Sequence, residues 1–144
     1  MFGFKNTKLA PAVTALILCS VLFAGCGRQA NPAKLDKMLR CDGGRLYYSS
    51  VITYGEARKM GDYLARYKFF KHDNPNKSAQ LTKKEKVYQF RIVGVEGKEN
   101  DAYYIDVVKL LATDISKEVF DGAPAEIHLC DKQFNTLRAV AAEQ

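Results

Sequence analysis

The sequence is poor in the residues that build metal centres and common catalytic sites. Its 144 residues include only two histidines, His72 and His128, and four cysteines that form no Cys-x-x-Cys pair. The chain has no Gly-x-Ser-x-Gly motif, no glycine-rich phosphate loop, no internal repeat and no low-complexity segment. These absences argue against familiar zinc sites, serine hydrolases and nucleotide-binding folds. They favour a binding protein over an enzyme, and no cofactor is expected.

The excess of positive charge is small. The chain carries 22 Lys and Arg against 16 Asp and Glu, a formal net charge of +6, and Lys5 and Lys8 contribute two of these charges. A nucleic-acid-binding protein normally has a denser basic stripe, so nucleic acid is not an expected partner. The mild charge suits a solubilising surface with some attraction to anionic polymers of a cell envelope.

The first 26 residues have the organisation of a bacterial export signal. Lys5 and Lys8 precede an apolar stretch from Leu9 to Leu22, and the small residues Ala24-Gly25 then precede Cys26. This pattern resembles the lipobox of bacterial lipoproteins. The resemblance implies that residues 1–25 are a signal peptide and that Cys26 becomes the first residue of the mature protein, with a lipid on its sulfur.

The same resemblance implies a location. The apolar stretch is too short for a standard membrane helix, so we expect an extracytoplasmic protein held to a membrane by its lipid. In lipoproteins of organisms with two membranes, Asp after the lipidated cysteine commonly marks inner-membrane retention. Gly27 occupies that position here, which implies the outer membrane in such an organism.

Residues 26–40 are expected to form a lipidated tether and a short helix. Asn31 and Pro32 suit the start of a helix over Ala33–Arg40, and Gly43-Gly44 suits its end. Residues 41–144 are then expected to form one α+β domain.

Within that domain, hydrophobic patterns predict a strand, a helix, two strands, a helix and a strand. Thr53 and Glu56 fit a capping box at the start of the first helix. The expected ranges are 46–52 (strand), 54–70 (helix), 78–82 and 87–93 (strands), 101–120 (helix), 125–130 (strand) and an extra edge strand near 137–140. This order is typical of a ferredoxin-like βαββαβ sandwich, an antiparallel sheet with two helices on one face.

Two cysteines remain once Cys19 is removed with the signal and Cys26 carries the lipid. In a ferredoxin-like sheet the first and last core strands are neighbours, which brings Cys41 near Cys130 and predicts a disulfide between them. The alternative is two unpaired thiols, with Cys130 as a small apolar residue at a strand end.

The sheet face without helices is the candidate binding surface. Strand alternation predicts that Gln89, Arg91, Glu126 and His128 lie on this face, where Arg91 could bind an anion; the alternative is an ordinary solvated face. Glu126, His128 and Cys130 also lie at two-residue steps and include the donor types that zinc accepts, and His72 could supply a fourth ligand. No second metal-binding motif accompanies them, so no metal site is predicted.

Two functions follow from these observations. The first is a lipid-anchored interaction module that binds an envelope protein or polymer, and it predicts an exposed apolar patch or an unpaired sheet edge. The second is a periplasmic lipoprotein that binds a small ligand or metal on the open sheet face, and it predicts a concave pocket with converging polar groups.

Overall fold

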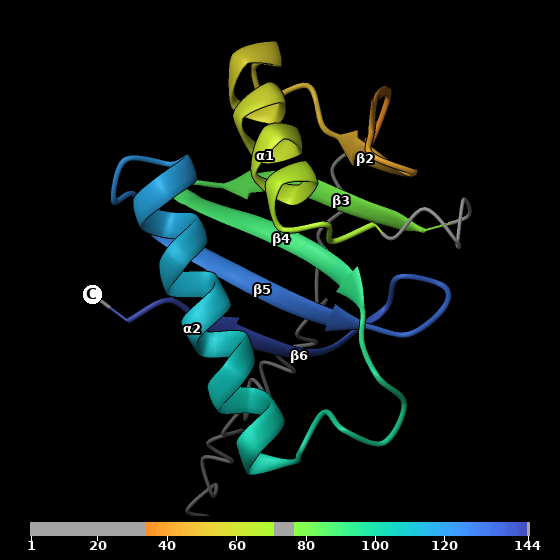
Figure 1. The fold of residues 1–144 in the computed structure, drawn as a ribbon, viewed down its shortest axis with the longest axis vertical. Coiled ribbons are helices and arrows are strands. Elements are labelled where there is room, and N and C mark those ends of the chain that lie inside the picture. Colours follow the sequence, from red (N-terminus) through yellow and green to blue (C-terminus); the bar gives the residue numbers. More distant parts are fainter. Residues whose placement is uncertain (1–33, 71–76, 144) are drawn as a thin grey trace, which may run out of the picture.

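The computed structural model describes residues 34–70 and 77–143 as one mixed α+β unit (Figure 1). A single six-stranded sheet carries both helices of the described residues on one face. The elements in chain order are β1 (Lys37–Cys41), β2 (Gly44–Tyr48), α1 (Tyr54–Arg66), β3 (Ser78–Lys84), β4 (Val87–Val93), α2 (Ala102–Val119), β5 (Ala125–Cys130) and β6 (Thr136–Ala141). The α+β class, both long helices and the extra C-terminal strand are confirmed.

The short helix expected over Ala33–Arg40 is wrong, because residues 37–41 form β1. This strand pairs antiparallel with β2 through a two-residue turn, since Cys41 lies opposite Gly44. Both turn residues have positive φ, 34° at Asp42 and 84° at Gly43. Asp-Gly is a preferred sequence for such a turn, because its backbone twist matches that of the two strands. The sheet therefore begins within the segment that the sequence assigned to the tether.

Helix α1 begins with the predicted capping box. The Thr53 hydroxyl accepts a hydrogen bond from the Glu56 backbone N–H at 3.2 Å, and the Glu56 carboxylate accepts one from the Thr53 N–H at 2.7 Å. The helix ends at Arg66, earlier than expected, because Lys68 turns into the left-handed region with φ of 50°. The N–H of Phe69 then bonds to the Leu64 carbonyl, which closes the helix end.

The strand order is β1-β2-β3-β4-β5-β6, so the ferredoxin-like arrangement is wrong. The sheet is mixed rather than antiparallel, because β2 and β3 are parallel and so are β4 and β5. A ferredoxin-like sheet would place β5 beside β2. Here the hairpin partner β1 occupies that edge of β2, and β3 occupies the other.

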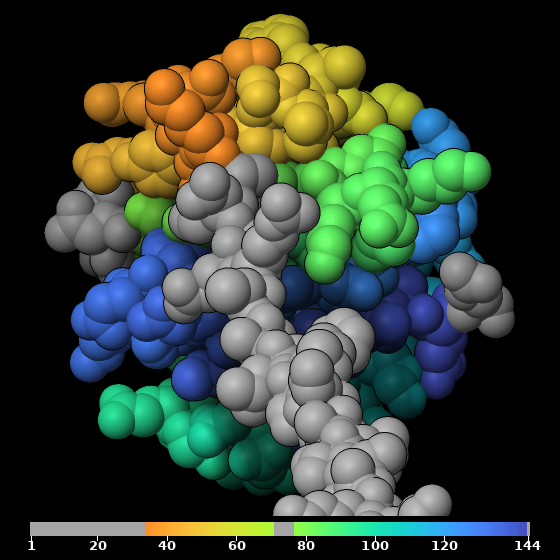
Figure 2. Space-filling view, turned by 180° about the vertical axis from the view of Figure 1, so that it is seen from behind, coloured from red at the N-terminus to blue at the C-terminus, as the bar shows by residue number. Residues whose placement is uncertain are grey.

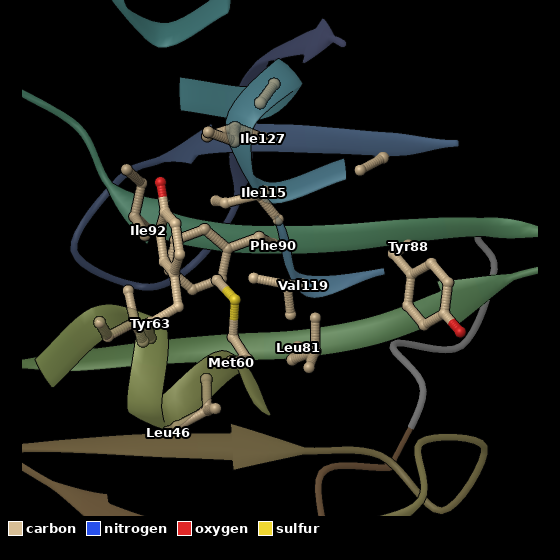
Figure 3. Close-up of a cluster of buried hydrophobic side chains, with 14 of the residues drawn as sticks. Leu46, Met60, Tyr63, Leu81, Tyr88, Phe90, Ile92, Ile115, Val119 and Ile127 are labelled. Atoms are coloured by element: carbon tan, nitrogen blue, oxygen red, sulfur yellow. The ribbon is translucent and has the colours of Figure 1, made fainter. Parts of the chain in front are cut away.

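The core lies between the sheet and the two helices. Alternate residues of each strand point to this side, and Phe90, Ile127 and Leu81 are all at most 1% exposed. Met60 from α1 and the pair Ile115 and Val119 from α2 meet them there (Figure 3). The opposite alternation places the remaining strand residues on the face turned away from the helices, which is the side from which Figure 2 views the molecule. Within residues 34–70 and 77–143, neither helix has the length and hydropathy needed to span a membrane.

Candidate functional site

The structure places the four predicted binding residues together on the open sheet face. Arg91 of β4 lies directly opposite His128 of β5, and Gln89 lies opposite Glu126 one step further along the same strands. Arg91 also lies opposite Gln80 of β3, which in turn lies opposite Tyr47 of β2. One row of polar side chains therefore crosses four neighbouring strands.

Three residues of this cluster, Gln89, Glu126 and His128, are joined by hydrogen bonds. His128 Nε2 lies 2.9 Å from the Glu126 carboxylate, and His128 Nδ1 lies 3.2 Å from the Thr136 hydroxyl. Gln89 Nε2 donates to the same Glu126 oxygen at 3.5 Å. His128 is 9% exposed, and these contacts hold its imidazole in place. The cluster has the properties of a satisfied structural network more than those of a surface that awaits a ligand.

Arg91 is the exception in this cluster. Its Nη2 donates to the carbonyl of Phe134 in the β5–β6 hairpin. Its Nε atom is buried and has no hydrogen-bond partner among the described residues. The guanidinium therefore ties the hairpin to β4, and one of its donors remains unused.

The predicted Cys41–Cys130 disulfide is wrong, because both residues are free buried thiols. Cys41 ends β1 and Cys130 ends β5, and three strands lie between these two. Four strand spacings of about 4.8 Å separate the residues by roughly 19 Å across the sheet. A disulfide requires Cα atoms within about 7 Å.

The three potential metal ligands on β5 use their donor atoms in other contacts. Glu126 and His128 pair with each other, and the Cys130 thiol donates to the His128 carbonyl at 3.4 Å. In the described part of the chain, no three His, Cys, Asp or Glu residues are grouped so that they could hold a metal ion. His72, considered as a fourth ligand, lies outside the described residues.

A cavity of about 300 Å³ lies at the end of the sheet, where the sequence predicted no site. Its lining residues come from the end of β4 and the loop after it, and from the end of β5 and the β5–β6 hairpin. Ligands of α/β sheets commonly bind at the carboxyl ends of parallel strands, and β4 and β5 form such a pair. The sequence did not reveal this place because it did not predict that β4 and β5 are parallel neighbours.

β6 and α2 both leave apolar side chains exposed. β6 is the outer strand of the sheet in the described residues, and α2 lies over both β5 and β6. In Figure 1 the N-terminal end of α2 extends past β6. On that half of the helix, Tyr103, Val107 and Leu110 are 81%, 46% and 66% exposed. They follow one another at four- and three-residue steps and form one stripe, here called the α2 stripe.

The features of residues 34–70 and 77–143 define a class: an α+β domain with a mixed sheet, one helix-covered face, an edge strand without a further strand partner and a small cavity at the sheet end. Comparison with protein families adds one match. The AF_1994_N model, described as a family N-terminal domain, matches residues 39–142, so the chain belongs to this family. No curated protein and no solved structure matches the chain.

Proposed function

We propose that this protein is a lipid-anchored interaction module of the cell envelope that binds a partner protein at its β6 edge. The observation that carries the proposal is an outer strand of the described sheet together with an exposed apolar stripe on α2, the helix that packs over this strand. An unpaired sheet edge and an exposed apolar patch are the two features expected of an interaction module. The polar cluster of the open face, by contrast, is occupied by its own hydrogen bonds.

The free edge of β6 offers backbone groups to a partner. The Ala142 N–H bonds to the Ala125 carbonyl of β5. In an antiparallel pair every second residue turns its backbone N–H and C=O toward the partner strand, so Val140 and Arg138 also face β5. The backbone groups of Ala139 and Ala141 therefore point outward. A partner that adds an extended segment can pair with such groups.

β6 lacks the charged side chains that usually protect an edge. Its only charged residue is Arg138, and the Arg138 guanidinium donates to the Glu99 carbonyl and the Asn100 side chain, both at 3.2 Å. The other outer strand, β1, is five residues long and carries exposed Lys37 and Arg40. Edge strands with such cations resist pairing with other chains, so β6 is the better docking edge.

The lipid anchor completes the proposal. Cys26 is the proposed attachment point, on the extracytoplasmic side of the membrane, and this membrane is the outer one in an organism that has two. Two or more acyl chains would hold the domain firmly at the membrane. We expect that Cys26→Ser leaves the precursor uncleaved at this site and unlabelled by fatty acid. Normal acylation of this variant would refute the assignment.

Photo-crosslinking in cells tests the partner surface. Benzoylphenylalanine in place of Tyr103 should give a discrete adduct with a second protein, visible by immunoblot. The same substitution at Tyr54 of α1 is the matched control, because Tyr54 is also an exposed helical tyrosine, 59% accessible. We expect no adduct there.

A second change separates edge pairing from contact by chance. Ala139→Pro removes an outward-pointing N–H and no bond to β5, so the fold should tolerate it. The adduct from position 103 should disappear in this variant. Equal adducts from both tyrosine positions, or an adduct that Ala139→Pro leaves unchanged, would refute the proposal.

A further inference from the structure

The cavity at the end of β4 and β5 has walls made mainly of hydrocarbon. Val93 ends β4, Val95 lies in the loop after it, and Leu129 and Leu137 contribute from β5 and β6. A volume of about 300 Å³ is at the small end of the range for ligand sites. These walls suit a compact apolar group.

The charged residues of the lining are mostly acidic. Glu96 and Glu99 come from the β4–α2 loop, Asp131 comes from the β5–β6 hairpin, and Lys132 is the one cation among the lining residues. The Asp131 carboxylate accepts hydrogen bonds from the side chain and backbone of Asn135 and from the backbone of Gln133, which lower the pKa of Asp131. Asp131 is therefore ionised at neutral pH, and the three acids outnumber the one base.

We propose that this cavity binds a small organic cation, with an apolar body against Val93, Leu129 and Leu137 and an ammonium group toward Glu96 and Glu99. An apolar wall excludes a bare metal ion or a strongly hydrated anion, because neither recovers its lost hydration there. Among apolar ligands of the same size, the excess of acidic groups favours those that carry a positive charge. Leu137 of β6 belongs to this site, but the outward backbone groups of Ala139 and Ala141 do not, and the site does not depend on the lipid anchor.

Cys130 gives the site a built-in reporter. Cys130 is one of the residues that line the cavity, and it is 1% exposed. Cys41, the other free thiol of the described residues, is also buried but lies on β1, outside the cavity. A ligand in the cavity should therefore shield Cys130 and leave Cys41 unaffected.

The first experiment measures alkylation of the two thiols in the full-length protein in lipid nanodiscs. N-ethylmaleimide is added with cyclohexylammonium or with cyclohexanecarboxylate, and mass spectrometry follows the Cys41 and Cys130 peptides separately. At ten times its dissociation constant, the ammonium should slow Cys130 about tenfold. The carboxylate should not, and Cys41 should react at its original rate in both cases.

The second experiment uses the absence of tryptophan from the chain. Gln133 is an exposed lining residue of the cavity, so Gln133→Trp places a single fluorophore at its mouth. Its emission should change with cyclohexylammonium and saturate. In the double variant Glu96→Gln, Glu99→Gln the same titration should weaken at least tenfold. Glu85→Gln, in the β3–β4 turn, is the matched control and should not change it.

The outcomes are distinct. Saturable binding that follows Glu96 and Glu99 supports the proposal. Equal effects of the ammonium and the carboxylate overturn the proposed charge selection, and equal slowing of Cys41 and Cys130 overturns the cavity as the place of binding. No response in either experiment overturns the site altogether. None of these results depends on the crosslinking of Tyr103.

Discussion

Gly44 is the position where a single added carbon should disturb the fold most directly. A Cβ atom at this residue would lie 2.2 Å from Cγ of Phe70 and 2.4 and 2.6 Å from its two Cδ atoms. Two carbon atoms that are not bonded to each other prefer a separation of about 3.5–4.0 Å, so the Phe70 ring would have to move by more than about 1 Å. Phe70 is 1% exposed, and the Phe69 ring packs edge-on against it with centroids 5.2 Å apart. Such a movement would disturb the contact of this buried ring with Phe69.

We expect Gly44→Ala to lower the free energy of unfolding by about 3 kcal/mol, the upper part of the range for overpacked cores. The measurement is urea unfolding of the full-length protein in detergent, followed by circular dichroism. Gly55→Ala is the matched control, since its added Cβ would meet only the Thr53 hydroxyl, at 3.9 Å. In the first turn of α1, that change should be neutral or stabilise the protein by up to about 1 kcal/mol.

A double-mutant cycle identifies the contact. Phe70→Ala alone should cost about 3–5 kcal/mol, because it empties a buried site. In the combined variant the new methyl group of residue 44 fills part of that space. The combined loss should therefore be smaller than the sum of the single losses by about 2 kcal/mol. Additive losses, or a Gly44→Ala protein within about 0.5 kcal/mol of the parent, would refute the reasoning.

Two further predictions concern titratable groups. Burial, and then the neighbouring Asp42 charge, raise the pKa of the Cys41 thiol to about 11, so native Cys41 should resist alkylation at pH 8. In denaturant without a reductant, a thiol assay should find both Cys41 and Cys130 free, and a bridge between them would contradict the sheet order. Burial opposes ionisation of Glu56, but hydrogen bonds from Tyr88 and Thr53 outweigh it and lower the pKa of Glu56 below its ordinary value of 4.5. Its stabilising effect should be complete above that value and disappear as the pH falls through the lowered pKa. The stability difference between the parent and Glu56→Gln should therefore shrink at acid pH, and a difference unchanged from pH 7 to pH 3 would disprove the assignment.

The sequence by itself determined the features that depend on residues close together in the chain. Alternation over Val87–Val93 predicted a strand and placed Gln89 and Arg91 on the open face, as the structure shows. Thr53 and Glu56 predicted the start of α1, because a capping box needs only residues three apart. The overlooked hairpin was also local. Asp42-Gly43 is a turn signal, but Gly43-Gly44 after an apolar stretch also predicts the end of a helix.

Only the tertiary structure decided which strands are neighbours. The period of a strand tells which face a side chain takes, but it contains no information on the strand that pairs beside it. The order β1-β2-β3-β4-β5-β6 therefore separated Cys41 from Cys130, made β4 and β5 parallel neighbours around a cavity, and left β6 as an open edge. The exposed side of α2 was likewise decided by packing. Tyr103, Val107 and Leu110 remain exposed because α2 packs on the sheet through another face, which carries the buried residues Val108, Ala112 and Ile115.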